Sequence, residues 1–155
     1  EVVDSGCNVQ LVMVGEGPEE NNLKDQIRDL DLEDKVFITP GEVSLEQYMT
    51  LFDIFCLPSI HEGLGLSLME AMAAGRACIA TNVGGLAELI TDEQDGILIP
   101  VADSQALAVA VKRLAEDFPL RERLANVARK KAFNKFAIED NIERMIEMYK
   151  GVVGT

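Results

Sequence analysis

Short apolar runs alternate with longer stretches of helical periodicity along the whole chain, and this alternation restricts the fold more than any other feature of the sequence. The runs are nearly uninterrupted in apolar residues, which is typical of strands in a parallel sheet covered on both faces. Strands that alternate with helices across short turns favour a doubly wound α/β domain. The expected strands are Gln10–Val14, Val36–Thr39, Asp53–Leu57, Ala77–Thr81 and Gly96–Ile99.

The segments between these strands carry apolar residues at helical spacing, with start signals for several helices. Ser44 and Gln47 form a capping box, and Asp103 or Ser104 caps a later helix. The expected helices are 22–30, 44–52, 65–75, 84–90, 103–116, 120–133 and 138–149. Because ligands of doubly wound sheets bind at the carboxyl ends of the strands, the candidate positions are Val14-Gly15, Thr39-Pro40, Leu57–His61 and Thr81–Gly85.

Size and charge exclude several classes of protein. The 155 residues, 48% hydrophobic and 26% charged, suit one globular domain with a substantial core. Residues 1–100 hold 19 acidic and 4 basic side chains, whereas residues 101–155 hold 8 and 10. A nucleic-acid-binding surface is therefore not expected in the first hundred residues. A phosphorylated ligand there must use backbone N–H groups and helix N-termini, or cations from sequence outside this chain.

The cysteines and the chain start bear on location and completeness. Cys7, Cys56 and Cys78 show no metal-ligand spacing, and an odd, sparse count favours buried thiols in a reducing cytoplasm over a disulfide scaffold. No apolar run approaches the roughly 18 residues needed to span a bilayer. The opening Glu1-Val-Val-Asp4 is typical of the end of a helix, so we expect a fragment of a longer protein.

The first strand ends in Gly15-Glu-Gly-Pro18, which begins like a dinucleotide-binding fingerprint. The third glycine is missing, because Glu20 occupies its position, and no acidic residue ends the following strand to bind a ribose. A nicotinamide-binding site is the less favoured interpretation. A tight turn followed by acidic residues that suit a helix N-terminus accounts for the same residues.

Two carboxylates flank a glycine-rich, otherwise apolar segment, Glu62 to Gly75. A helix starting near Gly65 would point its free N–H groups at the strand ends, ready for a diphosphate. Glu70 lies about 7–8 Å along the axis from Gly65, where a carboxylate could accept both ribose hydroxyls. Glu62 would then lie on the other side of the phosphates, near a sugar. The alternative is a helix N-terminal charge together with an unpaired core charge at Glu70, which is costly to bury.

The segment Pro58-Ser59-x-x-Glu62-Gly-Leu-Gly-Leu-x-Leu-x-Glu70-Ala-Met-Ala-x-Gly75 resembles the E-x7-E signature of the group 1 (family 4) retaining glycosyltransferases of the GT-B type, which have two Rossmann-like domains. The resemblance covers nearly the whole chain. It departs from the family at Gly75-Arg76-Ala77, where Gly-x-Pro is common. Further matches are Val14-Gly-x-Gly-Pro18, Val36-Phe-Ile-x-x-Gly41, Asp53, Ala80-Thr-Asn-Val-Gly-Gly85, Glu88 and Asp95-Gly96-x-Leu98.

The resemblance implies that residues 1–155 form the C-terminal, nucleotide-sugar-binding domain of a hexosyltransferase. It implies that Glu70 holds the ribose, that Glu62 orients the sugar as the catalytic residue, and that transfer retains configuration without a metal or other cofactor. The remaining implied donor-binding residues, of which Gly41 faces the base, are Gly15, Gly41, His61, Gly63, Leu64, Gly65 and Leu66.

The resemblance also implies that the acceptor-binding N-terminal domain and a cationic diphosphate clamp precede this chain. We therefore expect the isolated chain to be inactive and to bind donor weakly. The acceptor would be a glycan, a lipid or a small molecule reached through that domain, in an enzyme that is cytoplasmic or peripheral to the membrane. A non-catalytic sugar-nucleotide-binding module is the second interpretation.

Two other candidates have plainer explanations. Asp29-Leu-Asp31 matches the metal-binding DxD pattern, but at the end of a surface helix a solvated acidic face explains it better. His61, the single histidine, could carry a proton or contact a sugar hydroxyl, or it could simply lie at the rim.

Overall fold

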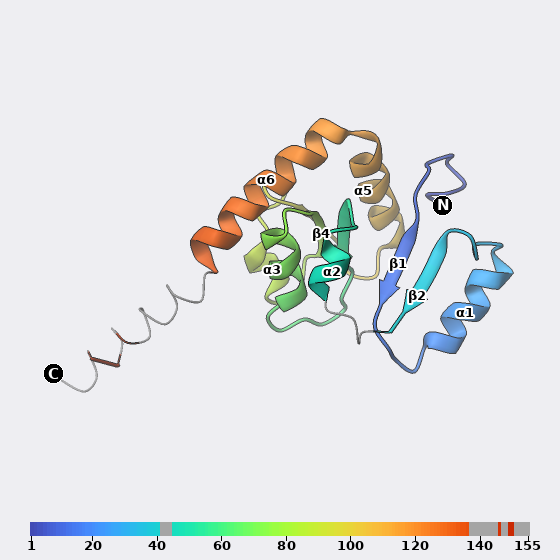
Figure 1. Ribbon diagram of the computed structural model, residues 1–155, viewed down its shortest axis with the longest axis horizontal. Coiled ribbons are helices and arrows are strands. Elements are labelled where there is room, and N and C mark those ends of the chain that lie inside the picture. The colour runs from blue at the N-terminus through green and yellow to red at the C-terminus, as the bar shows by residue number, and fades with distance from the viewer. Residues whose placement is uncertain (41–44, 137–145, 147–148, 151–155) are drawn as a thin grey trace.

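The computed structural model describes residues 1–40, 45–136, 146 and 149–150, and its elements alternate as expected (Figure 1). The capping residue Ser44 and nearly all of the helix expected over 138–149 lie outside the described residues. The strands are β1 (Leu11–Val14), β2 (Val36–Thr39), β3 (Ile54–Leu57), β4 (Ala77–Thr81) and β5 (Ile97–Ile99). The helices are α1 (Glu20–Asp29), α2 (Leu45–Met49), α3 (Leu66–Ala73), α4 (Leu86–Leu89), α5 (Ser104–Glu116) and α6 (Phe118–Lys135).

Local chemistry explains the helix starts. Asp103 accepts a hydrogen bond from Ala106 N and caps α5, as predicted. α6 begins two residues before the expected position, because Asp117 caps it by accepting from Leu120 N and because Pro119 fits the first helical turn.

All strand pairs are parallel, which confirms the α/β class, but the strands form two sheets rather than one. β1 pairs with β2, from Leu11 opposite Val36 to Val14 opposite Thr39. β4 lies between β3 and β5 in a second sheet. Within the described residues no ladder joins the two sheets.

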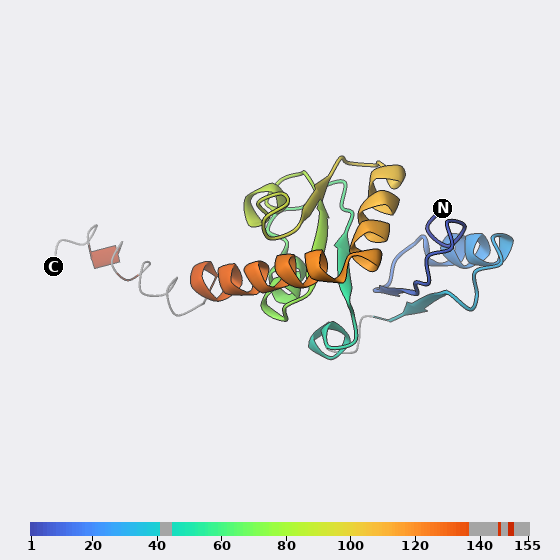
Figure 2. The ribbon, with the colours of Figure 1, turned by 90° about the horizontal axis from the view of Figure 1, so that it is seen from above.

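β4 is the centre of the core, and all five of its residues are buried. Ala77 and Ile79 face a cluster built with α5 and the first half of α6. Cys78 and Ala80 face a second cluster built with α3, α4 and the second half of α6. α6 therefore passes from one face of the sheet to the other, along the length visible in Figure 2.

The N-terminal unit, which comprises β1, α1 and β2, contributes nothing to these clusters. None of residues 1–40 is buried, and Leu11 and Phe37 of its strands are 48% and 43% exposed. In Figures 1 and 2 the unit, in blue, lies at one side of the molecule, with β1 nearer than β2 to the second sheet.

The cysteines behave as small apolar residues in the core sheet. Cys78 is buried and Cys56, on the neighbouring strand, is partly buried. Burial raises the pKa of the Cys56 thiol to about 12 and raises the pKa of Cys78 as well. Across the described residues no cluster of three potential metal ligands occurs, and none of their helices is both long and apolar enough to cross a membrane.

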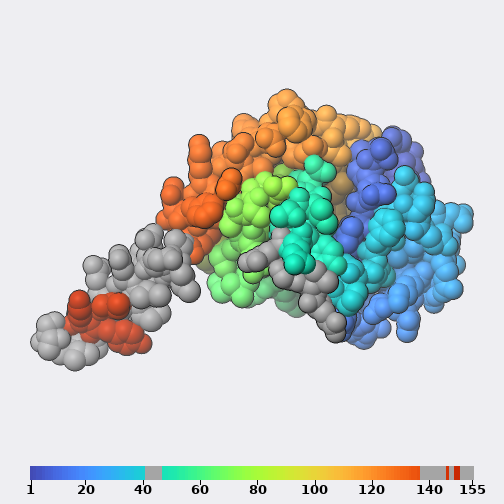
Figure 3. All heavy atoms as spheres, viewed as in Figure 1, coloured from blue at the N-terminus to red at the C-terminus, as the bar shows by residue number. Residues whose placement is uncertain are grey.

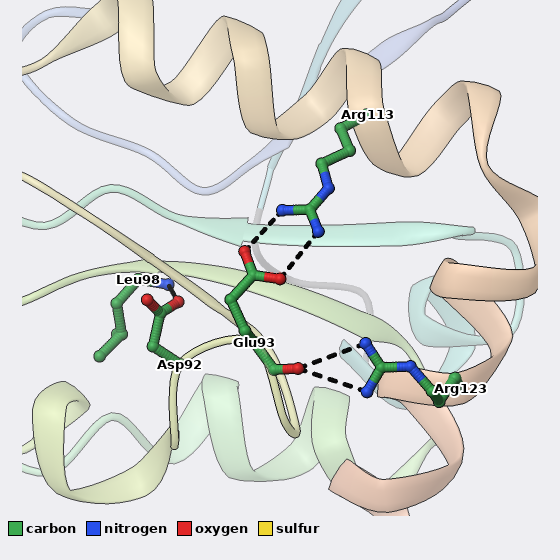
Figure 4. A network of polar contacts seen from close by, with 5 residues as sticks. All are labelled: Asp92, Glu93, Leu98, Arg113 and Arg123. Atoms are coloured by element: carbon green, nitrogen blue, oxygen red, sulfur yellow. Dashed lines mark hydrogen bonds and ion pairs between the residues drawn. The ribbon is translucent and has the colours of Figure 1, made fainter.

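The turn before β5 anchors both carboxyl-terminal helices (Figure 4). Asp92 accepts from Leu98 N at 2.9 Å. The Glu93 carboxylate pairs with both terminal nitrogens of Arg113 at 2.5 and 2.8 Å, while the Glu93 carbonyl accepts from Arg123. Arg113 lowers the pKa of Glu93. The pair therefore stabilises the fold above the ordinary carboxyl pKa, and this contribution is lost as pH falls through the lowered pKa.

A more buried ion pair fixes α6 to the same turn. Lys131 Nζ lies 2.7 Å from Asp95 Oδ2, and the two side chains are 13% and 6% exposed. The other Asp95 oxygen accepts from Thr91 N at 2.7 Å. Both charges are thus paired and hydrogen-bonded, which is the condition under which buried charges are tolerated.

Lys131→Met should lower the free energy of unfolding by about 3–5 kcal/mol, because it leaves Asp95 buried without its cation. The matched control is Lys130→Met, at a neighbouring exposed lysine, which should change it by about 0.5 kcal/mol at most. Urea denaturation of both variants measures the difference. If both variants lower the free energy of unfolding equally, the Lys131–Asp95 pair does not stabilise the fold as proposed.

Candidate functional site

The candidate site is the loop of residues 58–65, which joins the carboxyl end of β3 to the start of α3. Gly65 is the N-cap of α3 and has a φ of 68°, a conformation that favours glycine. A Cβ atom at Gly65 would also lie 2.6 Å from Leu86 Cδ2. α3 therefore starts where the sequence predicts, at Leu66, with its amino end at the carboxyl end of β3.

A second loop, after β4, holds the first one in place. Thr81 Oγ1 donates to Ser59 O at 2.6 Å, and Gly85 N donates to Glu62 O at 3.4 Å. A Cβ atom at Gly84 would lie 2.1 Å from Glu62 O, and one at Gly85 would lie 2.2 Å from the carbonyl oxygen of residue 63. Only glycine permits this approach. Ser59 and Thr81 both lie in strand-end segments that the sequence marks as candidate positions, but the hydrogen bond between them was not predicted.

The Glu62 side chain turns back onto the start of α3. Its Oε1 accepts from Gly63 N at 3.1 Å and from Gly65 N at 3.3 Å, and its Oε2 lies 3.5 Å from Ser59 Oγ. The sequence predicts that these N–H groups meet a diphosphate and that Glu62 lies beyond it. In the structure the carboxylate itself occupies two of them, because the positive end of a helix attracts the nearest anion.

Glu70 is exposed, so the alternative interpretation, in which it is an unpaired core charge, is wrong. α3 packs through Leu68, Ala71 and Met72, and at about 100° per residue position 70 lies on the opposite side of the helix. The helix appeared apolar all round because Leu66, one turn before Glu70, is 62% exposed. The α3 segment, in green, reaches the surface in Figure 3.

The other predicted residues are only partly brought together. His61 is exposed and lies between Ile60 and Leu64, which are 62% and 60% exposed. Gly15 lines a separate hollow of about 260 Å³ at the end of β1, formed by residues 13–20, 23 and 38. Glu62, Gly65 and Glu70 lie outside that hollow. Gly41 lies outside the described residues.

No basic side chain from the central part of the chain lies near this loop. Between Lys35 and Lys112 the sequence contains one basic residue, Arg76. Arg76 precedes β4 and donates to Phe52 O at 2.8 Å. It is therefore at the opposite end of the sheet from Thr81, roughly 16 Å away at 3.3 Å per residue. An anion at the loop would therefore contact backbone N–H groups and not a basic side chain from this region.

Parallel strands, flanking helices and a glycine-rich loop between β3 and α3 define a Rossmann-like α/β domain. The sequence profile of the family "Glycosyl transferases group 1" matches residues 3–131. The N-acetyl-alpha-D-glucosaminyl L-malate synthase of Bacillus anthracis is 30% identical over 146 residues, which are 94% of this chain and 38% of that protein. The chain belongs to the group 1 glycosyltransferases.

Solved structures agree with this assignment. Anabaena HepE in complex with UDP-glucose matches with a TM-score of 0.87 and 26% identity, over 97% of this chain and 44% of that one. The C-terminal domain of LpcC, a group 1 glycosyl transferase family protein of Francisella tularensis, matches with a TM-score of 0.76 and 27% identity, over 82% of this chain and 69% of that one.

Gly84→Ala should lower the free energy of unfolding by at least about 2 kcal/mol, because the added methyl group meets the Glu62 carbonyl and the position has a φ of 49°. Gly17→Ala is the matched control, since nothing lies within 4 Å of its Cβ position. Chemical denaturation compares the two variants. If Gly84→Ala is as stable as the control, the two loops are not packed backbone to backbone.

Proposed function

We propose that the chain is the donor-binding half of a glycosyltransferase that moves a hexosyl group from a nucleoside-diphosphate sugar to a hydroxyl acceptor with retention of configuration. The observation that carries this proposal is the hydrogen bonding of Glu62 to Gly63 N and Gly65 N, because a carboxylate held by N–H groups beside the start of α3 supports anion binding at the carboxyl end of β3. The solved complex of the similar HepE with UDP-glucose supports a donor of this class.

In the proposed donor complex the diphosphate replaces the Glu62 carboxylate at the start of α3. The backbone N–H groups of Gly63 and Gly65, joined by those of Leu66 and Ser67, then face the phosphate oxygens. Negative charge grows on the departing diphosphate during transfer, and fixed N–H dipoles at a helix start stabilise such charge. Glu62, no longer hydrogen-bonded to Gly63 N and Gly65 N, orients the sugar.

On this proposal Glu70 binds the ribose. It lies on the same side of α3 as Leu66, about 6 Å further along the axis at 1.5 Å per residue. Its carboxylate is exposed, so it is accessible to both hydroxyls of a nucleotide ribose without rearrangement of the core. His61 and Leu64 would contact the donor from the loop.

The negative charge of the sugar nucleotide's diphosphate exceeds what the backbone N–H groups alone can balance. We infer that cations from sequence outside residues 1–155 complete the site and that no resident metal is needed. On this proposal the isolated chain binds donor weakly and transfers no sugar. Measurable transfer by residues 1–155 alone, or loss of transfer by the intact protein on treatment with EDTA, would contradict this part.

Glu70→Gln should weaken donor binding by about 10–100-fold, because two hydrogen bonds to a charged acceptor become hydrogen bonds to a neutral amide. Calorimetry with a panel of UDP-, GDP- and ADP-sugars on the intact protein measures this. Folding should be unchanged, since Glu70 is exposed. Glu122→Gln, at an exposed carboxylate on α6, is the matched control. Unchanged affinity in Glu70→Gln would rule out the ribose role.

Glu62→Ala should separate binding from transfer. Removal of the competing carboxylate frees the helix start, so free nucleoside diphosphate should bind more tightly, whereas kcat for sugar transfer should fall by at least about 100-fold. A merely structural role would weaken diphosphate binding and transfer together. Titration of the nucleoside diphosphates alongside steady-state kinetics distinguishes the two outcomes.

A further inference from the structure

A pair of hydroxyl groups joins the N-terminal unit to residues 45–136, which we call the body. Thr39 ends β2, and its Oγ1 lies 2.7 Å from the phenolic oxygen of Tyr48 on α2, where either atom can be the donor. Within the described residues this hydroxyl pair is the one hydrogen bond between residues 1–40 and the body. In the same part of the chain no ion pair joins the two, and neither apolar cluster includes a residue of the N-terminal unit.

Tyr48 belongs to the body, because α2 is fixed there by its other side chains. Met49 is 1% exposed and lies in the cluster on the α3 side of the second sheet. Phe52, just after α2, packs against the same cluster, and its ring is stacked on that of Tyr48 with 6.1 Å between the ring centroids. In Figure 1 α2 lies between α3 and the N-terminal unit. Tyr48 is therefore a side chain of the body that reaches the carboxyl end of β2.

The main chain of Thr39 continues this connection to β1. The Thr39 carbonyl oxygen accepts from Gly15 N at 3.0 Å. The residue that ends β2 thus binds Tyr48 through its hydroxyl group and Gly15 through its carbonyl group. The path from Tyr48 through Thr39 ends at one of the predicted donor-binding residues.

The predicted donor-binding residues are divided between the two parts of the chain. Gly15 lies in the N-terminal unit, whereas Glu62, Gly65 and Glu70 lie in the body. A donor that contacts both parts must hold them at one separation, so any freedom between them is lost when it binds. A contact that fixes the separation beforehand reduces this entropic cost of binding.

We propose that Tyr48 is a positioning residue for donor binding, which acts through Thr39 on Gly15 and does not itself contact the donor. This inference rests on the proposed function. The hydroxyl pair sets the position of Gly15 relative to the start of α3, so that the carboxyl ends of β1 and β3 are arranged for one ligand before it arrives. Both side chains are only partly buried, so loss of the hydrogen bond leaves the apolar clusters intact.

A double-mutant cycle in the intact protein tests the role of the hydroxyl pair. Tyr48→Phe removes one hydroxyl group and keeps the ring that stacks on Phe52, and Thr39→Val removes the other. Each variant should bind its sugar nucleotide about 5-fold more weakly, because one hydrogen bond between neutral groups is lost. The double variant should bind no more weakly than either single variant, since all three lack the same bond. Calorimetry with UDP-, GDP- and ADP-sugars measures these affinities.

Three controls separate positioning from a general loss of structure. Tyr149→Phe changes a tyrosine that is 64% exposed and should leave donor affinity unchanged. Thr39→Ser keeps a hydroxyl group and should restore the affinity lost in Thr39→Val. Inorganic pyrophosphate, measured by its displacement of the donor, would contact only the start of α3 and should bind Tyr48→Phe as tightly as the wild type.

The cycle and its controls can overturn the proposal in three ways. Donor affinity in Tyr48→Phe equal to that of the wild type would show that the hydroxyl pair has no part in donor binding. An equal loss of pyrophosphate affinity would show a general structural effect. Losses that multiply in the double variant would show that the two hydroxyl groups act separately.

Amide hydrogen exchange without donor separates a failure of this inference from a failure of the proposed function. Gly15 N, which donates to Thr39 O, should exchange about 5-fold faster in Tyr48→Phe than in the wild type or in Tyr149→Phe. Unchanged exchange would overturn the proposal whatever the protein binds. Faster exchange in a protein that binds none of the sugar nucleotides would keep the hydroxyl pair as a joint and reject the proposed function, and with it the role of Tyr48 in donor binding.

Discussion

The carbonyl oxygens of Glu62 and Gly63 approach the backbone at residues 84 and 85 so closely that neither position has room for a Cβ atom, and the position of the loop that starts α3 depends on this approach. Two loops from neighbouring strands are locked together without intervening side chains. The loop that starts α3 is therefore held by main-chain geometry, assisted by the Thr81 hydroxyl at Ser59 O. The N–H groups of this loop are therefore held rigidly, and a charged ligand requires donors that are preorganised in this way.

The charges of this chain would oppose an anionic ligand, so such a ligand would depend on backbone donors. The protein carries a net charge of −13, and Arg76 is committed to carbonyl groups at the other end of the sheet. In the structure the start of α3 instead attracts an anion from within the chain, the carboxylate of Glu62. In the proposed donor complex the diphosphate takes the place of this carboxylate.

Much of the fold could be predicted from the residues, because the relevant signals are local. Uninterrupted apolar runs located all five strands to within one residue, and Gly65 located the start of α3. Three features could not be predicted. The exposure of Glu70 depends on which side of α3 meets the sheet, and an apolar helix carries no polar stripe to reveal it. The division into two sheets depends on strand pairing, and the position of the Glu62 carboxylate depends on a side-chain rotamer; neither leaves a pattern in the sequence.

The path of α6 has a consequence for how the molecule opens. Because this helix contributes to the clusters on both faces of β4, neither cluster can come apart without disturbing the other. The body around β4 should therefore open as one cooperative unit, at a cost close to that of global unfolding. The N-terminal unit has no buried residue and can open separately at much lower cost. The chain thus combines a slow-exchanging platform under the Glu62 loop with a β1–β2 segment that fluctuates independently of it.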